Sequence, residues 1–132
     1  MKFQTNKEKG NAGLAMAIAY FSTNGYTVSI PLNDTQDYDL VIEMDGNLSS
    51  VQVKASGCLT KNNKYQVALK SCGGTKGVTY KTLVNTRVDF LFVLLADKTM
   101  YLIPTNEIKN IATINIGAVS YTHLTLPTNM TV

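Results

Sequence analysis

A pair of apolar segments on either side of Asp45-Gly46 constrains the fold more than any other feature of this chain. An Asp-Gly pair favours the two-residue turn of a β-hairpin. Residues 38–44 and 49–55 are therefore predicted to be antiparallel strands.

The register of this hairpin decides which side chains share a face. With Asp45-Gly46 as the loop, Asp39 lies opposite Gln52, and with the loop one residue later it lies opposite Lys54. Both registers place Asp39, Gln52 and Lys54 on one face, where opposed Cβ atoms lie about 4.5–5.5 Å apart. The other face carries the apolar residues and is expected to pack on the core: Leu40, Ile42, Val51 and Val53.

The other elements follow from caps, periodicity and turn residues. Thr5 and Glu8 fit a capping box, and Asn24-Gly25 is a stop signal, so a helix is predicted from about residue 6 to 24. Strands are expected at 26–30, 65–69, 89–95 and 99–103, with the apolar 89–95 central; a glycine-rich loop at 71–77; helices at 79–86 and 104–111. With 132 residues and no repeat, this pattern indicates one α/β domain.

Composition excludes several classes of protein. No run approaches 18 apolar residues, so a membrane span and a membrane partner are not expected. The N-terminus lacks an apolar signal segment, and two cysteines exclude a disulfide-stapled miniprotein, so a cytoplasmic location is expected.

Charge is segregated along the chain. Residues 10–53 contain no Lys or Arg but five acids: Asp34, Asp37, Asp39, Glu43 and Asp45. Residues 46–88 contain no acid but seven bases, of which six are candidate DNA contacts: Lys61, Lys64, Lys70, Lys76, Lys81 and Arg87. The pattern predicts an acidic, cation-binding pocket inside a basic surface for polyphosphate, although an ordinary solvated lysine surface is the alternative.

The C-terminal segment does not resemble the rest of the chain. Residues 119–128 back-translate to the transposase-end adapter of sequencing libraries, read in frame over ten codons. We therefore expect residues 1–117 to form the domain and residues 118–132 to be a non-native tail; the alternative is a natural Thr-rich tail. The single histidine, His123, lies in that tail and receives no catalytic role.

A carboxylate, an amide oxygen and an ammonium group on one face form a plausible phosphodiester-cleaving site. Asp39, Gln52 and the backbone carbonyl of Val53 would offer oxygen ligands to Mg²⁺, for which Mn²⁺ could substitute. Lys54 would orient the attacking water and offset phosphate charge. The alternative is a cross-strand Asp–Lys pair on a solvated face.

These residues resemble the PD-(D/E)XK nuclease superfamily, most closely its small intron-encoded homing endonucleases. The resemblance runs from residue 9 to 108 and is carried by Lys9-Gly10 and by residues 25–32, 38–41, 51–54, 88–90 and 101–104. It implies a central mixed sheet flanked by helices in the order α-β-β-β-α-β. It also implies that Asp39, Gln52 and Lys54 catalyse Mg²⁺-dependent cleavage of double-stranded DNA, usually in a homodimer or higher homo-oligomer.

Two positions depart from the superfamily pattern. Gln52 replaces the usual Asp or Glu, as it does in the homing subgroup, and Leu14 replaces a frequent helix-one Glu. Glu8 could substitute as a metal ligand, but helical geometry puts it about 240° from position 14, which favours its capping role. Two alternatives stay open: a catalytically silent DNA-binding relic, and a Holliday-junction resolvase or restriction-type nuclease.

Overall fold

The computed structural model describes residues 5–33, 35–57, 59–69, 71–73, 79–81, 87–108 and 113–116. Its first element is the helix α1, Asn6–Thr23. The Thr5 hydroxyl accepts a hydrogen bond from the Glu8 amide at 3.0 Å, and Gly25 follows the helix with φ +90°. The predicted helix and both of its end signals are therefore confirmed.

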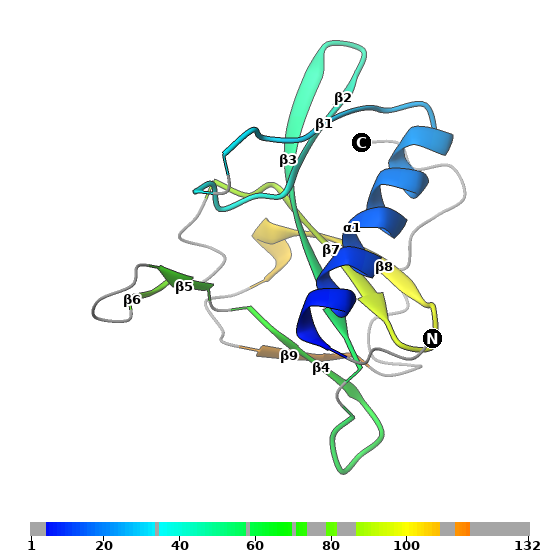
Figure 1. Cartoon of the computed structure of the whole chain (residues 1–132), viewed down its shortest axis with the longest axis vertical. Coiled ribbons are helices and arrows are strands. Elements are labelled where there is room, and N and C mark those ends of the chain that lie inside the picture. The colour runs from blue at the N-terminus through cyan, green and yellow to red at the C-terminus, as the bar shows by residue number, and fades with distance from the viewer. Residues whose placement is uncertain are drawn as a thin grey trace.

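A mixed five-stranded sheet forms the centre of the protein (Figure 1). Its strands, in spatial order, are β1 (Thr27–Ser29), β2 (Leu40–Met44), β3 (Asn47–Ser56), β7 (Phe90–Leu95) and β8 (Met100–Pro104). The β3–β7 pair is parallel and the other pairs are antiparallel. The α/β class and the mixed sheet are confirmed, although the centre is β3 and the apolar β7 lies beside it.

The turn between β2 and β3 sets the register of the hairpin. Asp45 and Gly46 have φ values of +53° and +83°, as the two-residue primed turns of hairpins require. Met44 pairs with Asn47 and Leu40 with Val51, which is the first of the two predicted registers.

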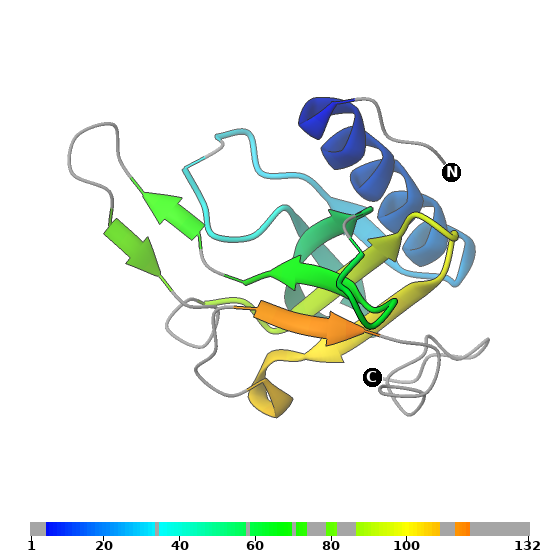
Figure 2. The same cartoon turned by 90° about the horizontal axis from the view of Figure 1, so that it is seen from below.

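Both faces of the sheet are covered (Figure 2). On one face α1 packs Ala17 and Phe21 against Leu40, Val51 and Phe92. On the other face a two-stranded ribbon covers Leu91, Val93 and Leu95; it is formed by β4 (Tyr65–Ala68) and β9 (Thr113–Ile116). Val51, Val53 and Ala55 of β3 pack in the layer with α1, and by the alternation of the strand Gln52 and Lys54 face the other side.

Gly13 allows α1 to lie close to β3. A Cβ atom at this position would be 3.1 Å from Val53 Cγ1 and 3.3 Å from the Ala55 Cβ. At Gly10, by contrast, a Cβ atom would meet nothing within 4 Å. The helix therefore lies close to the sheet at Gly13, over the strand that carries Gln52 and Lys54.

Three sequence-based predictions about local structure are wrong. Ser71–Gly73 and Thr79–Lys81 are the paired strands β5 and β6, so the expected loop and helix do not begin at these residues; residues 74–78 and 82–86 lie outside the described part. Within the range 104–111, where a helix was expected, Thr105–Glu107 form the 3₁₀ turn η2, and Ile108 has extended backbone geometry and is buried in the core; residues 109–111 lie outside the described part. Strand β9 was not expected.

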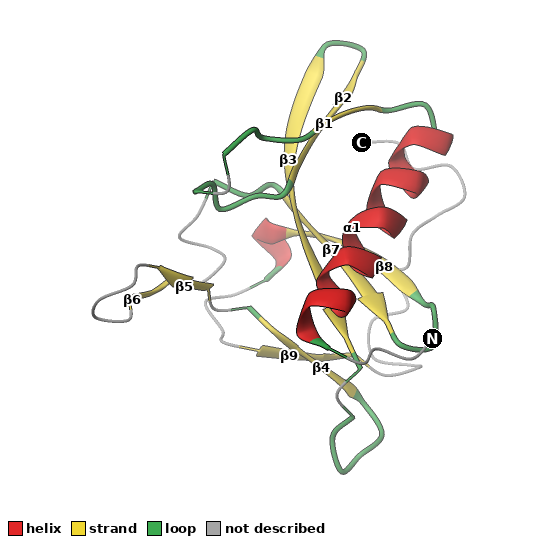
Figure 3. Cartoon of the chain, viewed as in Figure 1, coloured by secondary structure: helices red, strands yellow, loops and turns green. Residues whose placement is uncertain are grey.

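In the part of the chain that is described, α1 is the sole α-helix, and the 3₁₀ turn η2 is the other helical element; both are red in Figure 3. None of the described helices, α1 included, is long and apolar enough to cross a membrane. The proposed tail at 118–132, with His123, lies outside the described residues.

Candidate active site

Asp39 is anchored to β3 by its backbone and by its side chain. Its amide donates to the Val51 carbonyl at 2.8 Å, and its Oδ2 accepts from the Val53 amide at 2.7 Å. Asp39 is the residue just before β2, and these two bonds hold its carboxylate beside the middle of β3. The hydrogen bond uses Oδ2 alone, so Oδ1 remains to bind a cation.

The environment of Asp39 raises the pKa of its carboxyl group. Desolvation by surrounding protein atoms is the larger effect, and the hydrogen bond from Val53 and the charge of Lys54 lower the pKa in part. The residue as a whole is still exposed to solvent.

Lys54 lies half-buried on β3, on the sheet face opposite α1. Burial is the largest effect on its pKa and lowers it; the charge of Asp39 raises the pKa, and the charge of Lys9 lowers it further. The hydrogen bond from the Val53 amide holds the Asp39 carboxylate beside the residue next to Lys54, and each of the two charges affects the pKa of the other.

The other two proposed ligands lie at the same place on β3. Gln52 is half-buried and, by the alternation of the strand, shares the face of Lys54. The Val53 amide points to Asp39, and the N–H and C=O of one strand residue point to the same side. The Val53 carbonyl therefore also points toward the side of β3 on which Asp39 lies.

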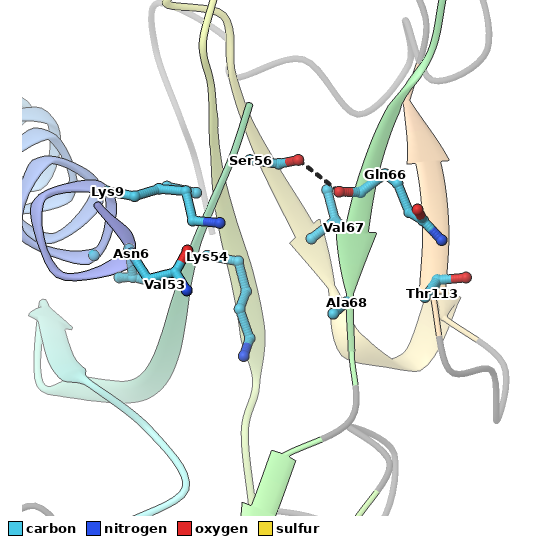
Figure 4. A pocket seen from close by; sticks show the side chains of 11 residues that line it. Asn6, Lys9, Val53, Lys54, Ser56, Gln66, Val67, Ala68 and Thr113 are labelled. Atoms are coloured by element: carbon cyan, nitrogen blue, oxygen red, sulfur yellow. Dashed lines mark hydrogen bonds between the residues drawn. The ribbon is translucent and has the colours of Figure 1, made fainter. Parts of the chain in front are cut away.

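A cavity of about 630 Å³ opens beside Lys54, between the start of α1 and β4 (Figure 4). Its lining comes from four elements: Asn6, Lys9 and Gly10 of α1, Val53–Ser56 of β3, Gln66–Ala68 of β4 and Thr113 of β9. The buried Ser56 donates to the Gln66 carbonyl and ties β4 to the end of β3.

Sequence reasoning did not identify the helix side of this cavity. Lys9 follows the tentative ligand Glu8 but was not itself predicted as a site residue; it lines the cavity because α1 packs across β3. Of the two glycines in this half of α1, Gly13 allows the close approach to β3 and Gly10 lines the cavity.

The expected acidic pocket is not formed by the described residues. Glu43 and Asp45 lie at the turn end of the hairpin, and Asp39 lies at the other end. Four residues of extended strand separate Asp39 from Glu43 by about 14 Å. In the described part of the chain no three His, Cys, Asp or Glu side chains gather.

The tentative ligand Glu8 is in the exposed first turn of α1 and does not line the cavity. Its amide is part of the helix cap, as the capping alternative predicted. Leu14 is half-buried in the core between α1 and the sheet. An acid at that position would point toward the sheet, so its replacement by leucine removes a carboxylate from this side of β3.

The proposed DNA contacts are only partly visible. Lys61 is exposed and Lys64 half-buried in the connection between β3 and β4, where the Thr60 amide donates to the Lys64 carbonyl at 2.8 Å. Arg87 is exposed, and its carbonyl accepts a hydrogen bond from the Ser50 hydroxyl at 2.6 Å. Lys70, Lys76 and the side chain of Lys81 lie outside the described residues.

Comparison with known proteins gives three consistent findings. The family model described as PD-(D/E)XK endonuclease matches residues 4–123. Protein 5.3 of Escherichia phage T7 is 32% identical over 109 residues, which are 80% of this chain and 86% of that protein. A bacterial homing endonuclease, I-Ssp6803I, superposes with a TM-score of 0.75 at 24% identity, over 94% of this chain and 86% of that one.

Proposed function

The chain belongs to the PD-(D/E)XK endonuclease family, and we propose that within it this protein hydrolyses phosphodiester bonds of double-stranded DNA with a divalent cation, as a homing-type endonuclease. The observation that carries the proposal is the anchoring of Asp39 to the Val53 amide, 2.7 Å away, beside Lys54. One carboxylate beside β3 thereby lies near one backbone carbonyl and one lysine of that central strand.

The donor atoms suit a hard cation. The Asp39 carboxylate, the Val53 carbonyl and the Gln52 amide offer oxygen atoms only, which are the ligands that Mg²⁺ and Mn²⁺ prefer. Magnesium, when bound, supplies positive charge that stabilises the scissile phosphate. With Gln52 and Leu14 in place of acids, Asp39 is the single carboxylate of this set, so we expect weaker metal binding than at a site with two or three acids.

Lys54 acts on the attacking water. Its Nζ donates a hydrogen bond to that water and places a positive charge next to it, which lowers the pKa of the water and fixes its position. Partial burial strengthens this effect, because charges interact more strongly where solvent is excluded. Asp39 accepts the Val53 hydrogen bond throughout, so its carboxylate does not reorient during the reaction.

The test is the nicking of supercoiled plasmid with Mg²⁺ and with EDTA. Lys54→Ala should abolish nicking while duplex binding in Ca²⁺ falls only modestly, since lysine contributes mainly to the chemical step. The matched control is Lys7→Ala, an exposed lysine of α1 away from the site. Nicking by Lys54→Ala at the wild-type rate would show that the catalytic assignment is wrong.

One alternative is supported by a specific observation. The two missing acids, at Gln52 and Leu14, favour a silent DNA-binding relic of the same fold. A protein that binds duplex tightly but does not nick in Mg²⁺ or Mn²⁺ would establish that alternative. Preferential cleavage of four-way junctions would instead indicate a resolvase, and sedimentation with DNA would test the proposed homo-oligomer.

A further inference from the structure

The cavity beside Lys54 has an unusual charge. Its lining includes two lysines, Lys9 from α1 and Lys54 from β3, and the described residues around it include no Asp or Glu (Figure 4). Two positive charges that share a cavity repel each other, and an anion between them removes that repulsion. A volume of about 630 Å³ is large enough for a group the size of a nucleotide.

Lys54 belongs both to the candidate active site and to the cavity. It lies next to Val53, whose amide anchors the Asp39 carboxylate, and it lines the cavity together with Lys9 and Asn6. Asp39 itself is not among the residues that line the cavity. The anchored carboxylate marks the place where a cation and the scissile phosphate would meet, and Lys9 and Asn6 belong to the neighbouring cavity.

We propose that this cavity is a second phosphate subsite, in which Lys9 and Asn6 hold a backbone phosphate adjacent to the one that Asp39 and Lys54 act on. The inference rests on the proposed function, because nucleic acid is the ligand. Each strand of B-DNA carries one phosphate per 3.4 Å of helix axis, so a strand that places one phosphate at Lys54 brings another toward the cavity. Lys9 then fixes the register of the strand and is a positioning residue.

The experiment compares Lys9→Gln with Lys9→Arg, which keeps the charge, and with Lys7→Gln. Lys7 is a matched control because it lies in the same helical turn, is exposed and does not line the cavity. In Ca²⁺, Lys9→Gln should weaken duplex binding by about tenfold, the loss expected for one charged contact. It should also flatten the slope of log K against log salt by about 0.9, whereas Lys9→Arg and Lys7→Gln stay near wild type.

A kinetic readout separates positioning from a structural role. In Mg²⁺, Lys9→Gln should raise KM with little change in kcat, and Lys9→Arg should restore KM. Equal losses in Lys9→Gln and Lys7→Gln, or no loss in Lys9→Gln, would overturn the subsite.

A third measurement needs no catalysis. Pyrophosphate titrated to millimolar concentration should shift the amide resonances of Gly10 and Ser56 in the wild type and not in Lys9→Gln; no shift in the wild type contradicts the proposal. If the wild type never nicks DNA but shows these effects, the subsite stands and the proposed hydrolysis fails. If it nicks DNA and Lys9→Gln behaves as wild type, the subsite fails and the hydrolysis stands.

Discussion

Replacing Gly13 by alanine should destabilise this protein, although the same change stabilises most helices. Alanine gains about 1 kcal/mol over glycine inside a helix. At Gly13, however, the new Cβ atom would lie 3.1 Å from Val53 Cγ1 and 3.3 Å from the Ala55 Cβ, both on the central strand. Overpacking of this kind costs about 1–3 kcal/mol. The net change is therefore expected to be a loss of about 0–2 kcal/mol.

Gly10 supplies the matched control in the same helix. A Cβ atom there meets nothing within 4 Å, so Gly10→Ala should keep the full gain of about 1 kcal/mol. The two variants should differ by about 1–3 kcal/mol in their free energy of unfolding. For a domain of this length each kcal/mol shifts the melting temperature by about 3–5 °C, which thermal denaturation resolves easily. The reasoning is refuted if Gly13→Ala melts at or above the temperature of Gly10→Ala.

Three further predictions concern the site and its surroundings. The raised pKa of Asp39 means that the folded state binds its proton more tightly, so wild-type stability falls as the pH rises from the ordinary value of 3.8 through the raised pKa. Asp39→Asn should therefore raise the melting temperature at pH 7, should have no such effect well below pH 3.8, and should abolish nicking. An equal rise in melting temperature at both pH values would contradict a raised pKa for Asp39. Thr5→Ala removes the acceptor of the 3.0 Å cap bond and should cost about 1 kcal/mol in urea unfolding, with Thr5→Ser near wild type. Replacing Lys61 and Lys64 together by Gln should flatten the salt dependence of duplex binding by about two units; an unchanged slope would mean that both lysines are ordinary surface residues.

The features that could be predicted from the sequence are those fixed by neighbouring residues. The register of the β2–β3 hairpin follows from Asp45-Gly46, and both ends of α1 follow from Thr5 and from Asn24-Gly25. Because Asp39 and Lys54 lie on this one hairpin, their proximity could also be predicted. No global information was needed for any of these features.

The features that could not be predicted depend on partners distant in sequence. Strand β9 exists because it pairs with β4, and nothing within residues 113–116 indicates that partner. The start of the expected helix at 79–86 is instead paired with β5. Lys9 joins the cavity only through the packing of α1 on β3. Each of these features depends on a tertiary contact, and at Thr79–Lys81 that contact overrides the expected helix.

The parallel pairing of β3 with β7 has a consequence for how the chain folds. The β2 edge of β3 is joined through a two-residue turn and can pair within about 1–10 μs, as hairpins do. Pairing of β3 with β7 requires the intervening chain, from Gly57 to Asp89, to form a closed loop first. Such non-local pairing is slow. In pulse-labelling hydrogen exchange during refolding, the amides of β2 should therefore become protected before those of β7. Until β7 pairs, β3 has an unpaired edge at what will become the centre of the sheet. A newly made chain is therefore most prone to aggregate during this interval.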